Sequence, residues 1–118
     1  MVERLCGKAR TSAGAISDVL MARYDVFKTV ADGFVVDCQA DFLDHLRTRF
    51  VVPLLPPELE PKVADRLNPI FAIDGANYVL FPQFAAAVPA QDLKQQITSL
   101  DHEHARIMAA LDMLMIGY

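Results

Sequence analysis

The residues most suggestive of chemistry form one short cluster, D-H-E-H, which runs from Asp101 to His104. Imidazole nitrogens and carboxylate oxygens are common zinc ligands, and a zinc-binding helix presents two histidines at positions i and i+4 on one face. His102 and His104 are two positions apart, so a helix would point them in different directions. The third histidine of the chain, His45, is distant in sequence. The sequence therefore predicts a solvated first helical turn here, with no metal site.

Other catalytic arrangements lack the residues that they need. Ser12 and Ser17 lie in a weakly patterned N-terminal stretch, and Ser99 stands where a helix cap is expected, so no catalytic triad is indicated. The five glycines are scattered, which excludes a phosphate-binding loop, and we expect no cofactor. Of the two cysteines, Cys6 and Cys38, the second is expected to be a buried free thiol in a strand-like run.

A last candidate for chemistry is D-F-L-D, from Asp41 to Asp44. Two neighbouring carboxylates can acquire different pKa values and divide acid–base work between them. These two, however, flank Phe42 and Leu43 just after a predicted strand, and an apolar pair between polar residues is more typical of a binding loop. The alternative is that Phe42 and Leu43 belong to the core.

The elements that position these residues are mostly strands. Runs rich in β-branched and aromatic residues predict strands over residues 24–29, 34–40, 47–54, 68–73, 77–81 and 84–88. The turns Ala31-Asp32-Gly33 and Asp74-Gly75-Ala76 join four of these strands into hairpins, Pro53 is expected to mark an edge or a bulge, and residues 90–98 are ambiguous. The fold class is mostly β (α+β), an antiparallel barrel or strongly twisted sheet closed by one C-terminal helix.

That helix is predicted from Ser99 onward, with Ser99 as its N-cap and apolar residues at helical spacing, namely Leu100, Ile107, Leu111 and Leu114. Asp112 is the last charged residue, and residues 113–116 are apolar all round. One helix face cannot bury all of these side chains. We therefore expect this end of the helix, together with the Phe42-Leu43 loop, to form an interaction surface.

Composition limits the class of protein. The chain has 118 residues, of which 53% are hydrophobic and 22% charged, which predicts one folded domain with its own core. The net charge of −4 disfavours direct binding to nucleic acid, although a local patch around Arg47 and Arg49 remains open. No apolar run is long enough to cross a membrane, and the N-terminus does not resemble a signal peptide, so we expect a cytoplasmic protein.

The chain divides at Met21. Residues 1–20 show neither helical nor strand periodicity, and we interpret them as a leader, an upstream start or a remnant of cloning. The alternative is a short helix over residues 12–20 that docks on the domain. The working domain is then residues 21–118.

Three stretches in this domain carry a resemblance to a known family. F-V-V-D-C-Q-A-D-F-L-D, residues 34–44, has a Val-Asp-x-Gln core and is similar to a strand and loop of the CcdB family of bacterial toxins. T-R-F-V-V-P-L, residues 48–54, resembles its Arg-x-Val-Ile-Pro-Leu strand. A-A-V-P, residues 86–89, is followed by L-D-H, the helix and a penultimate glycine, as in the family.

The resemblance implies an SH3-like barrel with a C-terminal helix, arranged as a homodimer, and it implies a topoisomerase poison rather than an enzyme. The dimer would bind the DNA gyrase A subunit and trap gyrase on cleaved DNA, and a CcdA-like antitoxin would remove it. The gyrase-binding residues carried over by position are Phe42, Leu43, Asp112, Met115, Ile116, Gly117 and Tyr118.

The tail departs from the family pattern. The family often has tryptophan at the position of Ile116, asparagine at that of Asp112 and a final isoleucine in place of Tyr118. An isoleucine cannot stack on an arginine as an indole can. Two alternatives therefore stay open: a ribonuclease toxin of the MazF and Kid type, in which Arg47 or Arg49 contacts phosphate, and an inactive relative that keeps the dimer.

Overall fold

The computed structural model describes residues 22–29 and 33–117. The leader predicted for residues 1–20, and Met21 and Tyr118 at the two ends of the predicted domain, lie outside these ranges. Within them no helix is long and apolar enough to cross a membrane.

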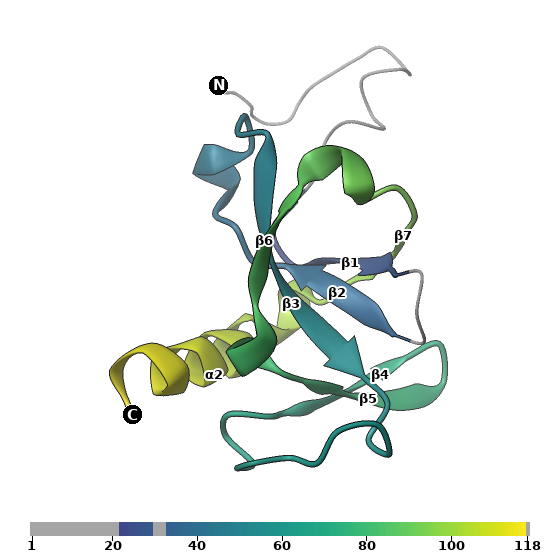
Figure 1. Cartoon of the computed structure of the whole chain (residues 1–118), viewed down its shortest axis with the longest axis vertical. Helices are drawn as coiled ribbons and strands as arrows, with labels where there is room; N and C mark the ends of the chain where they lie inside the picture. Colours follow the sequence, from purple (N-terminus) through teal and green to yellow (C-terminus); the bar gives the residue numbers. More distant parts are fainter. Residues whose placement is uncertain (1–21, 30–32, 118) are drawn as a thin grey trace.

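Within the described residues, seven strands form one sheet in which every pair is antiparallel, in the order β4-β5-β3-β2-β1-β7, with β6 beside β3 (Figure 1). The strands are β1 (Asp25–Lys28), β2 (Phe34–Asp37), β3 (Thr48–Leu55), β4 (Ile70–Ile73), β5 (Ala76–Leu80), β6 (Ala86–Pro89) and β7 (Gln96–Ser99). The sheet curls into a half-barrel, and the helix α2 (His104–Ile116) lies near the C-terminus. The predicted mostly β architecture, with an antiparallel barrel-like sheet and a C-terminal helix, is confirmed.

The long strand β3 organises the sheet. Its first half pairs with β6 as far as Val51, and its last residues pair with β5 from Leu54 onward. Pro53 lies between these two segments, where the ladder requires no N–H donor, so the missing N–H of proline costs no hydrogen bond. Its carbonyl accepts a hydrogen bond from Phe81 N at 3.0 Å. The sequence predicted an edge or a bulge at Pro53. The structure instead places it inside the central strand β3, at the point where the partner changes from β6 to β5.

The hairpin of β4 and β5 follows directly from its turn residues. Asp74 has φ 52° and Gly75 has φ 83°, so both central residues lie in the left-handed region that a type I′ turn requires. Asp-Gly is a preferred pair for this turn because its twist matches that of the flanking strands. The predicted hairpin is confirmed.

Helix α2 packs its buried residues against one face of the sheet. Ile107 and Ala110 are fully buried, and they share one core cluster with Val36, Val52 and Leu54 of the central strands. Of the apolar positions predicted along this face, Ile107 and Leu111 lie against the core, whereas Leu100 precedes the helix and Leu114 is exposed. The last turn of α2 projects beyond this contact (Figure 1).

The prediction for the start of this helix is wrong. Ser99 is the last residue of β7, where it pairs with Asp25 of β1, and its Oγ accepts a hydrogen bond from Asp101 N at 3.2 Å. A short 3₁₀ turn, η4 (Asp101–Glu103), follows, and α2 then begins with Glu103 in the capping position and no side-chain cap. The ambiguous residues 90–98 contain another 3₁₀ turn, η3 (Ala90–Asp92), and most of β7.

Candidate functional site

The end of α2 is exposed and apolar. Leu114, Met115 and Ile116 are 41%, 76% and 59% exposed, whereas Ile107 and Ala110 one to two turns earlier are fully buried. Large apolar side chains normally avoid water, and each contributes about 1.5 to 3 kcal/mol when it is fully buried. In the described part of this chain, residues 114–117, which we call the α2 tail, are all exposed.

The α2 tail has a defined end. Gly117 follows the helix with φ 88°, a left-handed conformation, and its N–H donates to Met113 O at 3.0 Å. Glycine adopts this conformation without steric cost and is the usual residue at this position. Asp112 is exposed on the same helix, and Tyr118 lies outside the described residues.

The second predicted contact element is a 3₁₀ turn, η1 (Asp41–Leu43), which leaves the sheet after β2. Phe42 is 86% exposed and Leu43 38% exposed. The alternative that placed these two side chains in the core is therefore wrong. An aromatic ring exposed to this degree makes few contacts of its own, so the main chain of the turn sets its position.

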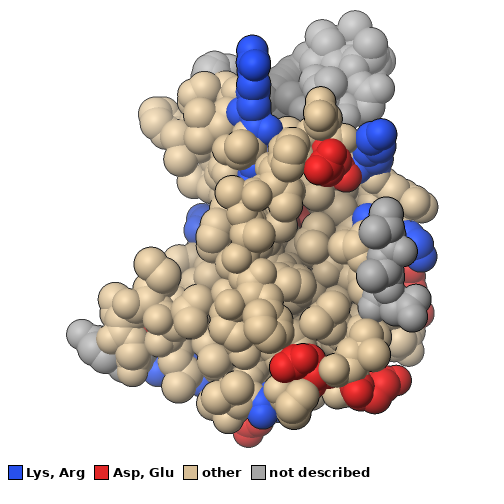
Figure 2. Space-filling view, in the orientation of Figure 1, with Lys and Arg blue, Asp and Glu red and all other residues tan. Residues whose placement is uncertain are grey.

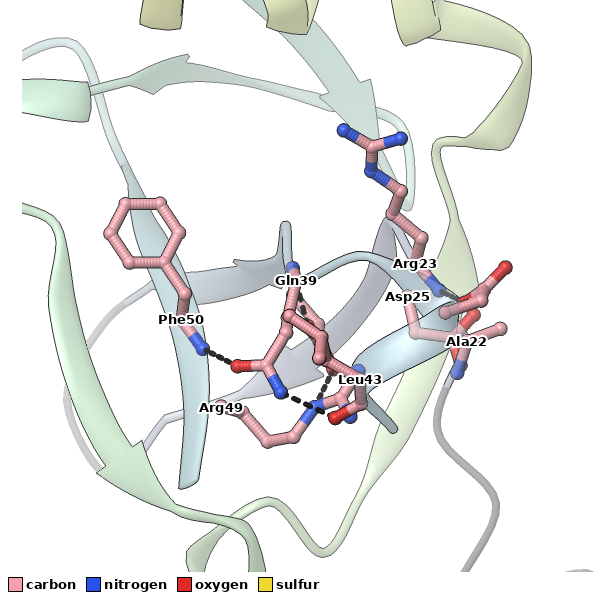
Figure 3. Close-up of polar contacts among 9 residues, drawn as sticks. Ala22, Arg23, Asp25, Gln39, Leu43, Arg49 and Phe50 are labelled. Carbon is pink, nitrogen blue, oxygen red and sulfur yellow. Dashed lines mark hydrogen bonds and ion pairs between the residues drawn. The ribbon is translucent and has the colours of Figure 1, made fainter. Parts of the chain in front are cut away.

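Polar side chains hold the η1 turn against β3 (Figure 3). Gln39 Oε1 accepts a hydrogen bond from Phe50 N at 3.0 Å, and Gln39 Nε2 donates to Leu43 O at 2.8 Å. On the other side of the turn, Asp41 Oδ1 accepts a hydrogen bond from Arg23 N at 2.8 Å. Gln39 and Asp41 thus tie the η1 turn to two separate segments.

A buried ion pair lies directly beneath this network. Asp37 and Arg49 are 0% and 1% exposed, and Arg49 Nε donates to Asp37 Oδ2 at 2.7 Å. Asp37 pairs with Val51 across the sheet, and Arg49 is two residues before Val51, so both side chains lie on the same face. The other oxygen of Asp37, Oδ1, accepts from Gln39 N at 3.0 Å. The ion pair therefore fixes the start of the loop that carries Phe42.

Burial makes this region sensitive to protonation. Desolvation raises the pKa of Asp37, and the hydrogen bond and charge of Arg49 oppose that effect only in part. Desolvation also raises the pKa of Asp25 to about 6, with smaller contributions from the charges of Asp37 and Asp41. Asp25 accepts hydrogen bonds from Ala22 N and from Gln96 Nε2. Two partly desolvated acids thus lie at the base of the η1 turn.

The sequence alone indicated no role for Gln39 or Asp37. It placed Arg49 in a surface patch or on phosphate, but Arg49 is buried against Asp37 and is not available for either. The sequence did contain one indication of this ion pair, namely an arginine within a predicted strand. A buried strand position tolerates an arginine only when a carboxylate faces it.

The candidates for metal or thiol chemistry have structural roles. Asp101, His102 and Glu103 form η4, and His104 Nδ1 lies 2.7 Å from Tyr24 Oη in a hydrogen bond. Among residues 22–29 and 33–117, no group of histidine, cysteine and acidic side chains is arranged to hold a metal ion. Cys38 is a buried free thiol, as predicted, and burial raises its pKa to about 12. Cys6 lies outside the described residues.

The two predicted contact elements do not meet within one chain. In Figure 1 the η1 turn lies near the top of the molecule and the end of α2 at the lower left, with β3 and β6 running between them. The structure thus presents two separate apolar projections, each with a different support.

A comparison with protein families decides the relationship. The family described as CcdB protein matches residues 23–117, which is most of the chain. The chain belongs to the CcdB family. Membership implies a gyrase-poisoning toxin of a toxin–antitoxin system, and proteins of this family inhibit an enzyme and are not enzymes themselves. No curated protein matches the chain.

The three stretches that resemble the CcdB family fall on the elements described above. Residues 34–44 contain β2, Gln39 and the η1 turn, residues 48–54 lie in β3, and residues 86–89 are β6. In this member of the CcdB family, the Val-Asp-x-Gln pattern is thus the origin of the polar network, since it contains both Asp37 and Gln39.

Proposed function

We propose that this protein is the toxin of a type II toxin–antitoxin module, that it binds the gyrase A subunit and traps the gyrase–DNA cleavage complex, and that a CcdA-like antitoxin neutralises it. The observation that carries the proposal is the unburied apolar α2 tail in a chain of the CcdB family. The proposed gyrase contacts are the pair Phe42 and Leu43 in the η1 turn and, at the end of the chain, Asp112, Met115, Ile116, Gly117 and Tyr118.

The proposed active form is a homodimer. Figure 2 shows a face almost free of charge over β6, η2 (Pro82–Phe84) and the end of α2, with charged side chains around its margin. Phe50, Phe84 and Leu114 are 39%, 45% and 41% exposed, and residues 82–91 include no charged side chain. Apolar surface of this kind is typical of an interface between subunits. A two-fold dimer would present two α2 tails to a two-fold partner and gain affinity from both.

The residues of the C-terminal end that differ from the family pattern determine how tightly the protein binds gyrase. Ile116 stands where the family often has tryptophan, so a cation–π contribution of roughly 0.5 to 2 kcal/mol per site is absent. Tyr118 offers a ring two positions later. We propose that it replaces the indole, and a Tyr118→Ala variant that binds and poisons gyrase as well as the wild type would refute that role.

The experiment is a cleavage assay with purified gyrase, supercoiled DNA and ATP, followed by denaturation. We expect linear DNA with the wild-type protein and none when residues 115–118 are deleted. A milder pair of variants is Met115→Asp and Val63→Asp, since both residues are exposed, at 76% and 74%, but only Met115 lies in the α2 tail. Met115→Asp should abolish cleavage and Val63→Asp should preserve it.

The alternatives predict different outcomes. A folded dimer that yields no linear DNA and does not arrest growth would be an inactive relative of the family. RNA cleavage by the purified protein would indicate a ribonuclease of the MazF and Kid type. The burial of Arg49 against Asp37 weighs against the latter, because it removes one of the two arginines proposed to contact phosphate.

A further inference from the structure

Gln39 occupies an unusual place at the end of the β2–β3 ladder. The ladder runs from Phe34 to Asp37 in β2, and Cys38 N still donates to Phe50 O at 2.8 Å. In a regular antiparallel pair, Phe50 N would return a hydrogen bond to the main chain of Cys38. It donates instead to Gln39 Oε1 at 3.0 Å. The side chain of Gln39 thus replaces a main-chain acceptor at the point where the chain leaves the sheet.

The other end of the same amide reaches the η1 turn. Gln39 Nε2 donates to Leu43 O at 2.8 Å, and Leu43 O also accepts from Leu46 N at 3.2 Å. Only one orientation of the amide satisfies both partners, because its oxygen must face an N–H and its nitrogen a carbonyl. A single side chain therefore connects β3 to the last residue of the turn (Figure 3).

The main chain of Gln39 is fixed as well. Its N–H donates to Asp37 Oδ1 at 3.0 Å, and the carboxylate of Asp37 is held by Arg49 Nε at 2.7 Å. Arg49, Asp37 and Gln39 thus form a chain of contacts that begins in a fully buried ion pair and ends at Leu43. Among the residues that the structure describes, no comparable contact holds the ring of Phe42, which is 86% exposed.

We infer that Gln39 is the positioning residue of the gyrase-contacting turn, which fixes the main chain of η1 so that Phe42 and Leu43 are presented in one pose before the partner arrives. This inference rests on the proposed function. A turn that is ordered in advance loses less conformational entropy on binding, so the effect belongs to affinity more than to folding.

Two substitutions of Gln39 separate its roles. Gln39→Ala removes both side-chain hydrogen bonds, whereas Gln39→Glu keeps an acceptor for Phe50 N and turns a carboxylate oxygen toward Leu43 O. Gln95→Glu is the matched control. Gln95 is exposed and lies at the opposite end of the β1–β2 hairpin, where its carbonyl accepts from Lys28 N.

The measurements are the affinity of each variant for a purified gyrase A fragment, the thermal midpoint, and backbone order parameters from NMR. We expect Gln39→Ala and Gln39→Glu each to weaken binding roughly 10-fold, about 1.4 kcal/mol, with little change in the thermal midpoint. Order parameters should fall over residues 41–46 and stay constant in the strands. Gln95→Glu should match the wild type in all three measurements.

A double-mutant cycle with Phe42→Ala distinguishes positioning from a general structural role. If Gln39 acts through Phe42, Gln39→Ala should cost less than 2-fold in affinity once Phe42 is already alanine. A 10-fold loss that persists in the Phe42→Ala background, or an equal loss in Gln95→Glu, would overturn the inference. If the wild-type protein does not bind gyrase, the proposed function fails. The order parameters then decide the positioning role alone, and unchanged values over residues 41–46 would refute it.

Discussion

The two surfaces proposed to contact gyrase are held in opposite ways. The α2 tail continues a regular helix whose earlier turns are packed in the core through Ile107 and Ala110, and it ends at Gly117, which has no side chain. The η1 turn has no buried residue of its own and depends on the hydrogen bond that Gln39 donates to Leu43 and the one that Asp41 accepts from Arg23 N. A helix inherits its position from packing, whereas a short turn needs specific polar contacts. Substitutions that disturb one support should therefore leave the other surface in place.

The largest effect is expected from the buried ion pair beneath η1. Asp37→Ala leaves Arg49 buried without its carboxylate, which should lower the free energy of unfolding by about 3 to 5 kcal/mol. Urea unfolding measures this loss. Combining Asp37→Ala with Arg49→Met removes both charges and should restore part of the stability. Asp92→Ala, at an exposed site in η3, is the control. A loss below 1 kcal/mol for Asp37→Ala would show that the pair does not support this end of the sheet.

A smaller effect, a gain in affinity for gyrase, is expected at the α2 tail. Ile116→Trp restores the ring that the family often has there, and the site is 59% exposed, so the fold can accept it. Affinity for the gyrase A fragment should rise by roughly 0.5 to 2 kcal/mol with unchanged thermal stability. Leu59→Trp, at a 57% exposed site outside both contact elements, controls for a larger apolar surface. Equal gains in both variants would remove the special role of Ile116.

Local residue preferences were enough to predict much of the fold. Runs of β-formers located most of the strands, and Asp74-Gly75 identified a hairpin, because both features depend only on neighbouring residues. Ser99 failed as a helix cap because it pairs with Asp25, which is far away in sequence. No local pattern reveals such a partner. The strand β7 could not be recognised for the same reason, since most of it lies within residues 90–98, whose pattern was ambiguous.

The candidate site could be predicted only in part. The exposed apolar residues of the α2 tail were foreseen, because an all-round apolar turn cannot be buried on one face. The role of Gln39 could not be foreseen, since its contacts with Leu43 and Phe50 arise from the place where the chain leaves the sheet. Asp37 and Arg49 are 12 residues apart, and only the register of β2 and β3 brings them together.

The next effect concerns the end of the helix. An alanine at position 117 would meet no atom within 4 Å, but the φ of 88° is unfavourable for any residue with a Cβ. Gly117→Ala should therefore destabilise the last turn by about 1 to 2 kcal/mol. Because the tail can fray locally, we expect a several-fold loss of gyrase affinity and little change in global unfolding. Gly117→Asn should lose less, since asparagine tolerates this conformation. Equal losses for the two variants would indicate that gyrase contacts Gly117 itself and that the backbone conformation is not the cause.

The smallest effect concerns Asp25 and tests only the region beneath the η1 turn. Its pKa in the folded protein is raised to about 6, so the protonated acid is favoured by folding. The resulting stabilisation is complete below the unfolded pKa near 4 and is lost as the pH rises through about 6. Asp25→Asn mimics the neutral acid, and it should therefore exceed the wild type in stability at pH 7, by on the order of 1 kcal/mol after allowance for solvent screening.

Unfolding of both proteins at pH 4 and pH 7 checks this prediction. The advantage of Asp25→Asn should vanish at pH 4, where the wild-type carboxyl is itself protonated. Asp112→Asn removes the same charge at an exposed site on α2 and should gain no comparable advantage. An equal gain in the two variants would mean that net charge, and not the burial of Asp25 beside Asp37 and Asp41, governs the response. A gain confined to Asp25→Asn would place the pH-sensitive part of the molecule beneath the η1 turn and leave the α2 tail, which is held by packing, independent of it.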